Sequence, residues 1–145
     1  MIGIVLISHG AFAQGLLNAA SMLYGGEQCS ALGLEPADSP EEFQERLENA
    51  VDEADKGDGV FILADLYGGT PCNRAVALLA VQAASEKKKK LRLLAGANLP
   101  MLISLMDARL NDTSFDELAE TVLSEAASAM TDVSAIMKKE GFIND

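Results

Sequence analysis

The feature of this 145-residue chain that most restricts its fold is a regular alternation of short apolar runs with segments of helical spacing. The apolar runs are rich in Val, Ile and Leu and have the length of buried strands, at residues 2–7, 29–34, 60–64 and 91–95, of which 29–34 is the weakest. Between them apolar residues recur every three or four positions, as on one face of a helix. This alternation predicts a single α/β domain around a mainly parallel sheet, with helices on both faces as a three-layer sandwich.

Several residues mark where the helices are expected to begin. Ser39 followed by Pro40 is a strong start, because serine caps helices and proline is tolerated in the first turn. Thr70 is expected to cap the helix after the third strand. The remaining predicted helices span Phe12 to Tyr24, Met101 to about Leu110, and Ser114 to about Met137, with a capping box formed by Ser114 and Glu117 directly after Asp112 and Thr113. We expect one domain over residues 1–137 and a polar, frayed tail over residues 138–145.

The charge balance restricts the partners of the chain. The sequence contains 22 Asp and Glu residues against 11 Lys and Arg residues, a formal net charge of −11. Nucleic acids and anionic membranes are disfavoured as partners because they are themselves negatively charged. The four lysines at 87–90 indicate a solvated helix end. The apolar run at the amino terminus is much shorter than the roughly 20 residues of a membrane span and follows no basic segment, so we expect a cytoplasmic protein.

The sequence offers little for a metal or a cofactor. Cys29 and Cys72 have no CxxC spacing and are expected to be reduced, small hydrophobic residues. For Cys72 a reactive thiol at a helix amino terminus is the alternative to packing. One histidine without a second good ligand makes a poor zinc site, and neither GxGxxG nor GxxxxGK[ST] occurs. We therefore expect no metal and no cofactor.

Polar residues follow three of the predicted strands. The first strand ends in Ser8-His9-Gly10, which contains the only histidine of the chain, the third is followed by residues 65–70 (DLYGGT), and the fourth by residues 96–98 (GAN). Ligands of open α/β sheets bind outside the carboxyl ends of the strands, where the strand order reverses. If the order is 2-1-3-4, the first and third strands are adjacent, and His9 and Asp65 are neighbours at that reversal.

A histidine beside a carboxylate has a defined chemistry. A carboxylate that accepts the proton-bearing ring nitrogen fixes the tautomer and leaves the other nitrogen as a nucleophile. Asp65 would also stabilise a phosphohistidine, whose ring gains positive character, while the backbone N–H groups of Gly68, Gly69 and Thr70 suit phosphoryl oxygens. The alternatives at this point are a structural role for His9, a simple turn and helix cap at residues 68–71, and Asp65 as a cap of a neighbouring N–H.

The chain contains the segments IGIVLISHGAFAQGLLNAASMLYG, FILADLYGGTPCNRA, LLAGANLPMLISLMDAR and SFDELAETVLSEA. They include the motifs SHG, D-[aromatic or apolar]-x-GG-[ST]-P-x-N and G-x-N-x-P-M. In this order and spacing the chain resembles the IIA domain of the mannose family of the bacterial sugar phosphotransferase system. The resemblance covers essentially the whole sequence, and the combination of motifs is far more specific than any one of them.

The resemblance implies a phosphotransferase component that acts as a phosphocarrier. His9 would accept a phosphoryl group on Nε2 from the phosphocarrier protein HPr and pass it to a IIB component. Asp65 would bond to Nδ1, Thr70 would help to hold the phosphoryl group, and Asn73 and Asn98 would have structural or orienting roles. The family fold implies the strand order 2-1-3-4 and a homodimer in which an antiparallel edge strand is exchanged. It also implies indirect association with the IIC and IID membrane subunits.

Further functional hypotheses remain open at this stage. Since the chain carries no appended IIB domain, we expect a free-standing IIA protein whose IIB component is supplied separately. A regulatory module of the same fold, whose phosphorylation reports sugar supply without a transport partner, is the principal alternative. A more distant one is a flavodoxin-like module that binds a small ligand without covalent chemistry. The transported sugar is not readable, because in such systems specificity belongs to the membrane subunits.

Overall fold

The structure, a computed structural model, describes residues 1–111 and 113–144 and contains a four-stranded parallel sheet. Its strands are β1 (Gly3–His9), β2 (Cys29–Leu34), β3 (Val60–Ala64) and β4 (Leu91–Ala95). Its helices are α1 (Phe12–Tyr24), α2 (Pro40–Ala54), α3 (Thr70–Ala84), α4 (Leu99–Ala108), α5 (Phe115–Ser128) and α6 (Val133–Lys139). The strand order is β2-β1-β3-β4, so the predicted α/β class and the predicted order are both confirmed.

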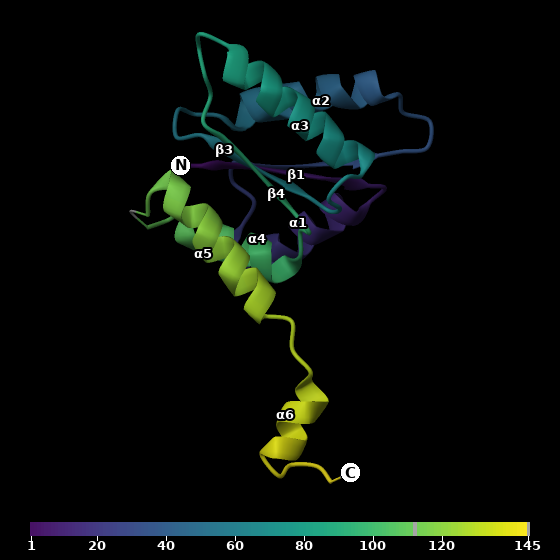
Figure 1. The fold of residues 1–145 in the computed structure, drawn as a ribbon, viewed down its shortest axis with the longest axis vertical. Coiled ribbons are helices and arrows are strands. Elements are labelled where there is room, and N and C mark those ends of the chain that lie inside the picture. Colours follow the sequence, from purple (N-terminus) through teal and green to yellow (C-terminus); the bar gives the residue numbers. More distant parts are fainter. Residues whose placement is uncertain (112, 145) are drawn as a thin grey trace.

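The sheet is covered by helices on both faces, which gives the domain three layers (Figure 1). Helices α2 and α3 lie on one face, and α1, α4 and α5 lie on the other. Successive side chains of a strand point to opposite faces, so the central strand β1 contributes to both cores. Val5 and Ile7 pack in the core under α2 and α3, whereas Ile4 and Leu6 pack in the core with α1 and α4. This two-sided burial explains why β1 is continuously apolar from Ile4 to Ile7 rather than alternating.

The register of the sheet brings two chemically important strand ends together. In the β1–β3 ladder Ile7 lies opposite Ala64, and the Asp65 N–H donates to the Ile7 carbonyl oxygen at 3.1 Å. His9 is the last residue of β1, and Asp65 directly follows β3. Both residues therefore stand at the carboxyl edge of the two central strands, as the sequence predicts.

Side-chain caps begin two of the helices as predicted. The Ser39 hydroxyl accepts from the Glu42 N–H, and the Glu42 carboxylate accepts from the Ser39 N–H, which is a complete capping box at α2. At α5 the Ser114 hydroxyl accepts from the Glu117 N–H, but the Glu117 carboxylate accepts from that hydroxyl instead of the backbone. Asp112, part of the predicted start of this helix, lies outside the described residues.

Two helix starts differ from the prediction. Thr70 is the first residue of α3 rather than its cap, because Gly69 occupies the N-cap position without a side-chain hydrogen bond. The predicted cap is therefore wrong, and the Thr70 hydroxyl is not used to begin the helix. Helix α4 begins at Leu99, two residues before the predicted start, because the Asn98 side chain accepts from the Met101 N–H at 2.8 Å.

The predicted continuous helix from Ser114 to Met137 is wrong. The structure contains two helices there, α5, which ends at Ser128, and α6, which begins at Val133. Helix α6 extends away from the domain (Figure 1). The predicted boundary between domain and tail, at residue 137, falls inside α6, and the division itself stays a prediction. Asp145, the last residue of the predicted tail, lies outside the described residues.

Polar side chains and missing packing explain the break between α5 and α6. The Ser128 hydroxyl donates to the Glu125 carbonyl oxygen at 3.0 Å, and the Asp132 carboxylate accepts from the Ala135 N–H at 3.0 Å. These bonds occupy groups near one helix end and cap the next helix start. After Ala126 every described residue is exposed, so no buried contact holds the two segments in line.

Two further predictions concern the surroundings of the domain. The four strands of the described sheet are all parallel, and no antiparallel edge strand occurs within residues 1–111 and 113–144. The exchange of such a strand between two subunits therefore stays a prediction. In the same part of the chain, no helix combines the length and the apolar character needed to cross a membrane.

Candidate active site

The centre of the candidate site is a hydrogen-bonded pair formed by His9 and Asp65. Asp65 Oδ2 lies 2.8 Å from His9 Nδ1 and also accepts the His9 backbone N–H at 2.9 Å. One carboxylate oxygen thus holds both the backbone and the ring of the same residue. The Asp65 side chain is 16% exposed and the His9 side chain is 49% exposed, so a largely buried anchor holds an accessible imidazole. Within the described part of the chain His9 Nε2 has no hydrogen-bond partner.

The turn after His9 is fixed by two hydrogen bonds that the sequence does not predict. The Gly10 N–H donates to the Leu34 carbonyl oxygen at 2.8 Å, which ties the turn to the end of β2. The Ser8 hydroxyl is fully buried and accepts from the Ala13 N–H at 2.7 Å in the first turn of α1. Helix α1 has no side-chain cap at Ala11, so Ser8 satisfies a donor at its start. No local motif could have indicated this role, because Ser8 precedes the helix by several residues.

The loop from Gly68 to Thr70 lies against the imidazole. A Cβ atom added to Gly69 would be only 2.7 Å from His9 Cε1 and 3.4 Å from Nε2, so the ring rests on the bare Gly69 backbone. The Gly69 N–H, predicted as a phosphoryl contact, already donates to the Leu66 carbonyl oxygen at 3.2 Å. Among the described residues, the backbone N–H groups of Gly68 and Thr70 and the Thr70 hydroxyl have no hydrogen-bond partner.

Three other residues of the predicted motifs stabilise the fold around the site or its core. The Asn73 amide donates to the Gly68 carbonyl oxygen at 3.1 Å and so holds the loop beside His9. Asn98 caps α4, which is the structural role expected of it. Cys72 is 2% exposed and packs in the core under α2 and α3, so the packing interpretation is confirmed over that of a reactive thiol.

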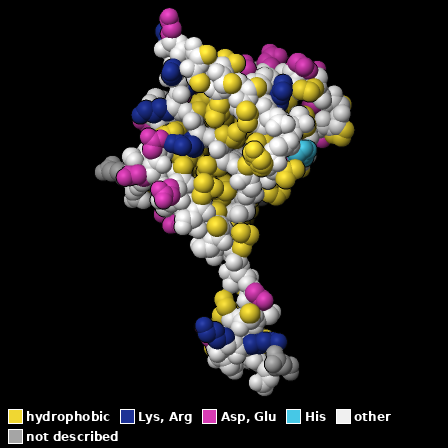
Figure 2. Space-filling model, viewed as in Figure 1, with side chains coloured by type: hydrophobic (Ala, Val, Ile, Leu, Met, Phe, Trp, Pro, Cys, Tyr) yellow, Lys and Arg dark blue, Asp and Glu magenta, His cyan; other side chains and the backbone are white. Residues whose placement is uncertain are grey.

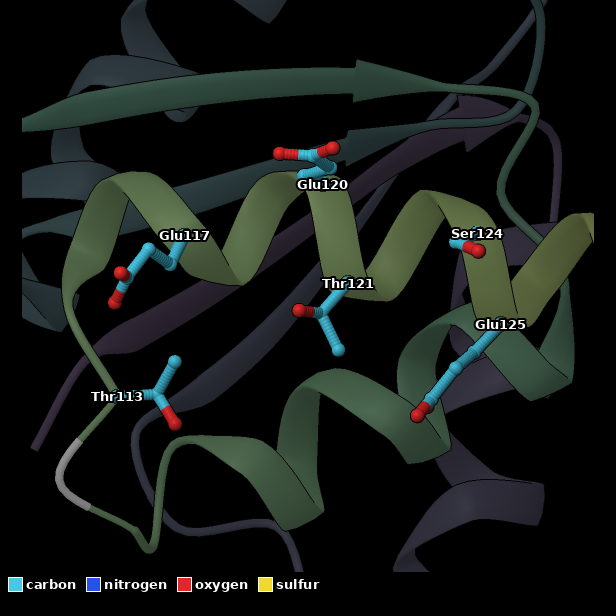
Figure 3. Close-up of a pocket in the computed structure, with 6 residues that line it drawn as sticks. All are labelled: Thr113, Glu117, Glu120, Thr121, Ser124 and Glu125. Carbon is cyan, nitrogen blue, oxygen red and sulfur yellow. The ribbon is translucent and has the colours of Figure 1, made fainter.

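A separate hollow of about 590 Å³ lies along α5 (Figure 3). Figure 3 shows side chains of α5 and of the segment before it around this hollow, and the lining residues are Thr113, Glu117, Glu120, Thr121, Ser124 and Glu125. The Glu125 carboxylate there accepts from the Ser104 hydroxyl of α4. Across residues 1–111 and 113–144, no group of three or more His, Cys, Asp or Glu side chains is placed to hold a metal ion. The hollow shares no residue with the His9 site.

Comparison with known proteins agrees with this geometry. The family model described as "PTS system fructose IIA component" matches residues 3–123, well over half of the chain. The mannose-specific EIIAB component of Escherichia coli K12 is 35% identical over 118 residues, which cover 81% of this chain and 35% of that protein. The match thus spans only 35%, about a third, of the length of this relative. The sorbose-specific EIIA component of Klebsiella pneumoniae is 27% identical over 120 residues, 83% of each protein.

A solved structure extends the likeness to three dimensions. The phosphotransferase system component EIIA of Streptococcus agalactiae superposes with a TM-score of 0.82 at 27% identity, over 93% of this chain and 99% of that one. The region matched by the family model contains the whole sheet, His9, Asp65 and the loop that carries Gly69. The chain belongs to the mannose-type family of IIA components of the sugar phosphotransferase system.

Proposed function

We propose that this chain is a phosphocarrier that receives a phosphoryl group on His9 from phosphorylated HPr and passes it to a IIB component during sugar uptake. The observation that carries the proposal is the pairing of His9 Nδ1 with Asp65, at 2.8 Å, while Nε2 has no partner within the described residues. This arrangement keeps the proton on Nδ1 and the lone pair on Nε2, which is the form a nucleophilic imidazole needs.

His9 and Asp65 are sufficient to account for every bond and proton in the proposed transfer step. The Nε2 lone pair forms a bond to phosphorus as the bond from phosphorus to the donor's nitrogen breaks, and that electron pair returns to the donor. His9 keeps its Nδ1 proton, so the phosphorylated ring carries positive charge, and the Asp65 carboxylate stabilises it through a charge-assisted hydrogen bond. The same events run in the opposite sense when the IIB component takes the phosphoryl group. Asp65 does not exchange a proton in either direction.

The start of α3 is the proposed binding site for the phosphoryl oxygens. Helix α3 has 15 residues and begins beside the imidazole, so its positive end faces the incoming group. The Gly68 and Thr70 N–H groups and the Thr70 hydroxyl are the donors of this loop that have no partner within residues 1–111 and 113–144. The Gly69 N–H is engaged by Leu66 and could join them only after this bond opens.

The surface around His9 supports a protein, rather than a small molecule, as donor and acceptor. Phe12, Leu66 and Tyr67, which flank the site in the chain, are 49%, 57% and 86% exposed. Figure 2 shows the single histidine at the surface next to hydrophobic side chains. Exposed apolar residues around a reactive group are typical of a protein docking surface. With a net charge of −11, the chain suits partners that present basic patches.

The remaining proposals concern the setting of this phosphocarrier. We place it in the cytoplasm, as a homodimer whose edge strands are exchanged, in indirect association with IIC and IID membrane subunits. The relatives differ in the sugar for which they are named, mannose in one and sorbose in the other, so the transported sugar is left unassigned. No observation favours the regulatory module without a transport partner.

The test is phosphorylation of the purified chain by phosphoenolpyruvate, enzyme I and HPr. We expect one acid-labile phosphoryl group per chain, its loss in His9→Ala, and its transfer to the cognate IIB protein. The matched control is Asn49→Ala on the exposed surface of α2, which should be phosphorylated as the unmodified chain is. If the His9→Ala variant still incorporates the group, the site assignment is wrong.

A further inference from the structure

We propose that Gly69 is a positioning residue for His9: its bare backbone is the seat on which the imidazole rests, and Asn73 holds that seat in place. The proposal rests on the proposed function, since it concerns how the phosphoryl-accepting ring is aimed. It gives Gly69 a role different from that of a phosphoryl contact.

A single hydrogen bond does not fix the orientation of an imidazole. Asp65 Oδ2 holds Nδ1, but the ring can still tilt about that contact and carry Nε2 to either side. Gly69 restricts this tilt, because it lies against Cε1, the ring atom between the two nitrogens. A Cβ at Gly69 would come within 2.7 Å of Cε1. The carboxylate on one side and the glycine backbone on the other therefore define one ring orientation.

The position of the seat is itself determined by hydrogen bonds. The Asn73 amide donates to the Gly68 carbonyl oxygen at 3.1 Å, and the Asn73 backbone N–H donates to the Gly69 carbonyl oxygen at 2.9 Å. Gly68 has φ of +82°, in the left-handed region that favours glycine. The hydrogen bond from the Asn73 side chain thus helps to keep the turn at Gly68 and Gly69 against His9.

The consequence of a side chain at Gly69 follows from its backbone. Gly69 has φ of −71° and ψ of 162°, which any residue adopts, so alanine introduces no backbone strain. The atom in its way is the end of the His9 side chain, which can move without unfolding the domain. A Gly69→Ala variant should therefore fold normally while its imidazole is displaced from the position that Asp65 and the seat define.

The experiment compares Gly69→Ala with Gly15→Ala. Gly15 lies on α1, and a Cβ atom added there has no neighbouring atom within 4 Å outside its own helix backbone and adjacent residues. His9 is the only histidine, so the ring nitrogens of a ¹⁵N-labelled sample give one set of NMR signals. We expect the fraction of the Nδ1–H tautomer to fall in Gly69→Ala and to stay unchanged in Gly15→Ala. The rate of phosphorylation by phospho-HPr should fall about tenfold or more in Gly69→Ala, since small misplacements of a reacting group have large kinetic effects.

A second variant covers the case in which Gly69→Ala fails to fold by circular dichroism. Asn73→Ala removes this hydrogen bond to Gly68 without adding an atom and should change the His9 signals in the same direction, with a smaller loss of rate, whereas Asn49→Ala should change neither. If Gly69→Ala folds and its His9 ring signals are unchanged, the proposal is overturned, even where the rate of phosphorylation falls. If Gly69→Ala is unfolded, unchanged His9 signals in Asn73→Ala overturn it. If the unmodified chain takes no phosphoryl group, the proposed function fails, while the NMR comparison still decides whether Gly69 seats the ring.

Discussion

Replacement of Asp65 by asparagine tests the electrostatic part of the proposed mechanism most directly. The two side chains are nearly isosteric, and an asparagine oxygen could still accept the His9 backbone N–H at 2.9 Å and Nδ1–H at 2.8 Å. What changes is the charge opposite the ring. In addition, the buried Asp65 Oδ1 has no partner among the described residues, so an amide NH₂ placed there would lack an acceptor.

The expected magnitude follows from the kind of hydrogen bond that is lost. A hydrogen bond to a charged group contributes about 1.5–3 kcal/mol and a neutral one about 0.5–1.5 kcal/mol, so the phosphorylated ring loses roughly 1–2 kcal/mol of stabilisation. Because about 1.4 kcal/mol corresponds to a factor of ten, phosphorylation of Asp65→Asn should be roughly 5- to 30-fold slower. The His9 side chain is 49% exposed, which favours the lower part of this range.

The assay is a quenched-flow measurement of phosphoryl transfer from phospho-HPr, with His9 phosphorylation followed by mass spectrometry under alkaline conditions. Asp116→Asn is the matched control. It removes the same negative charge as Asp65→Asn, but Asp116 pairs with Arg92 at the other end of the sheet. An Asp65→Asn rate equal to that of the control would refute the role of the carboxylate. A loss equal to that of His9→Ala would also contradict the calculation, because it would make Asp65 indispensable rather than stabilising.

Three further predictions concern the fold and its titrating groups. Ser39→Ala removes the hydroxyl that accepts the Glu42 N–H at the start of α2 and should lower the unfolding free energy by about 1 kcal/mol in urea denaturation; an unchanged midpoint would contradict this. The nearby negative charge of Asp107 raises the pKa of Tyr24, so stability should decline as the pH rises from about 10 through the higher folded value. In Asp107→Asn ultraviolet titration should show Tyr24 ionising at lower pH, and an unmoved curve would exclude Asp107 as the cause. Burial raises the pKa of the Cys29 thiol, so iodoacetamide should label it slowly at neutral pH and faster as the pH rises, whereas labelling as fast as free cysteine would contradict this burial.

The sequence by itself was sufficient for the class of fold and for the strand ends that carry the chemistry. Strands and most helix starts depend on neighbouring residues, through apolar periodicity and through caps such as Ser39, so they can be predicted locally. His9 and Asp65 can be identified because each is a polar residue at the end of a predicted apolar strand, and motifs over the whole chain agree with the family. The sequence does not predict the break between α5 and α6, because helical spacing alone does not show that the packing ends at Ala126.

Only the tertiary structure decided how these residues meet. His9 and Asp65 are 56 positions apart, and the strand register determines that Oδ2 reaches both the ring and the backbone of His9. The contact of the imidazole with Gly69 and the engagement of the Gly69 N–H by Leu66 likewise depend on the conformation of one loop beside another strand. No local periodicity or capping residue in the sequence predicts such contacts between distant segments. The sequence therefore determined which residues stand at the sheet edge, and the packing determined how the ring is aimed.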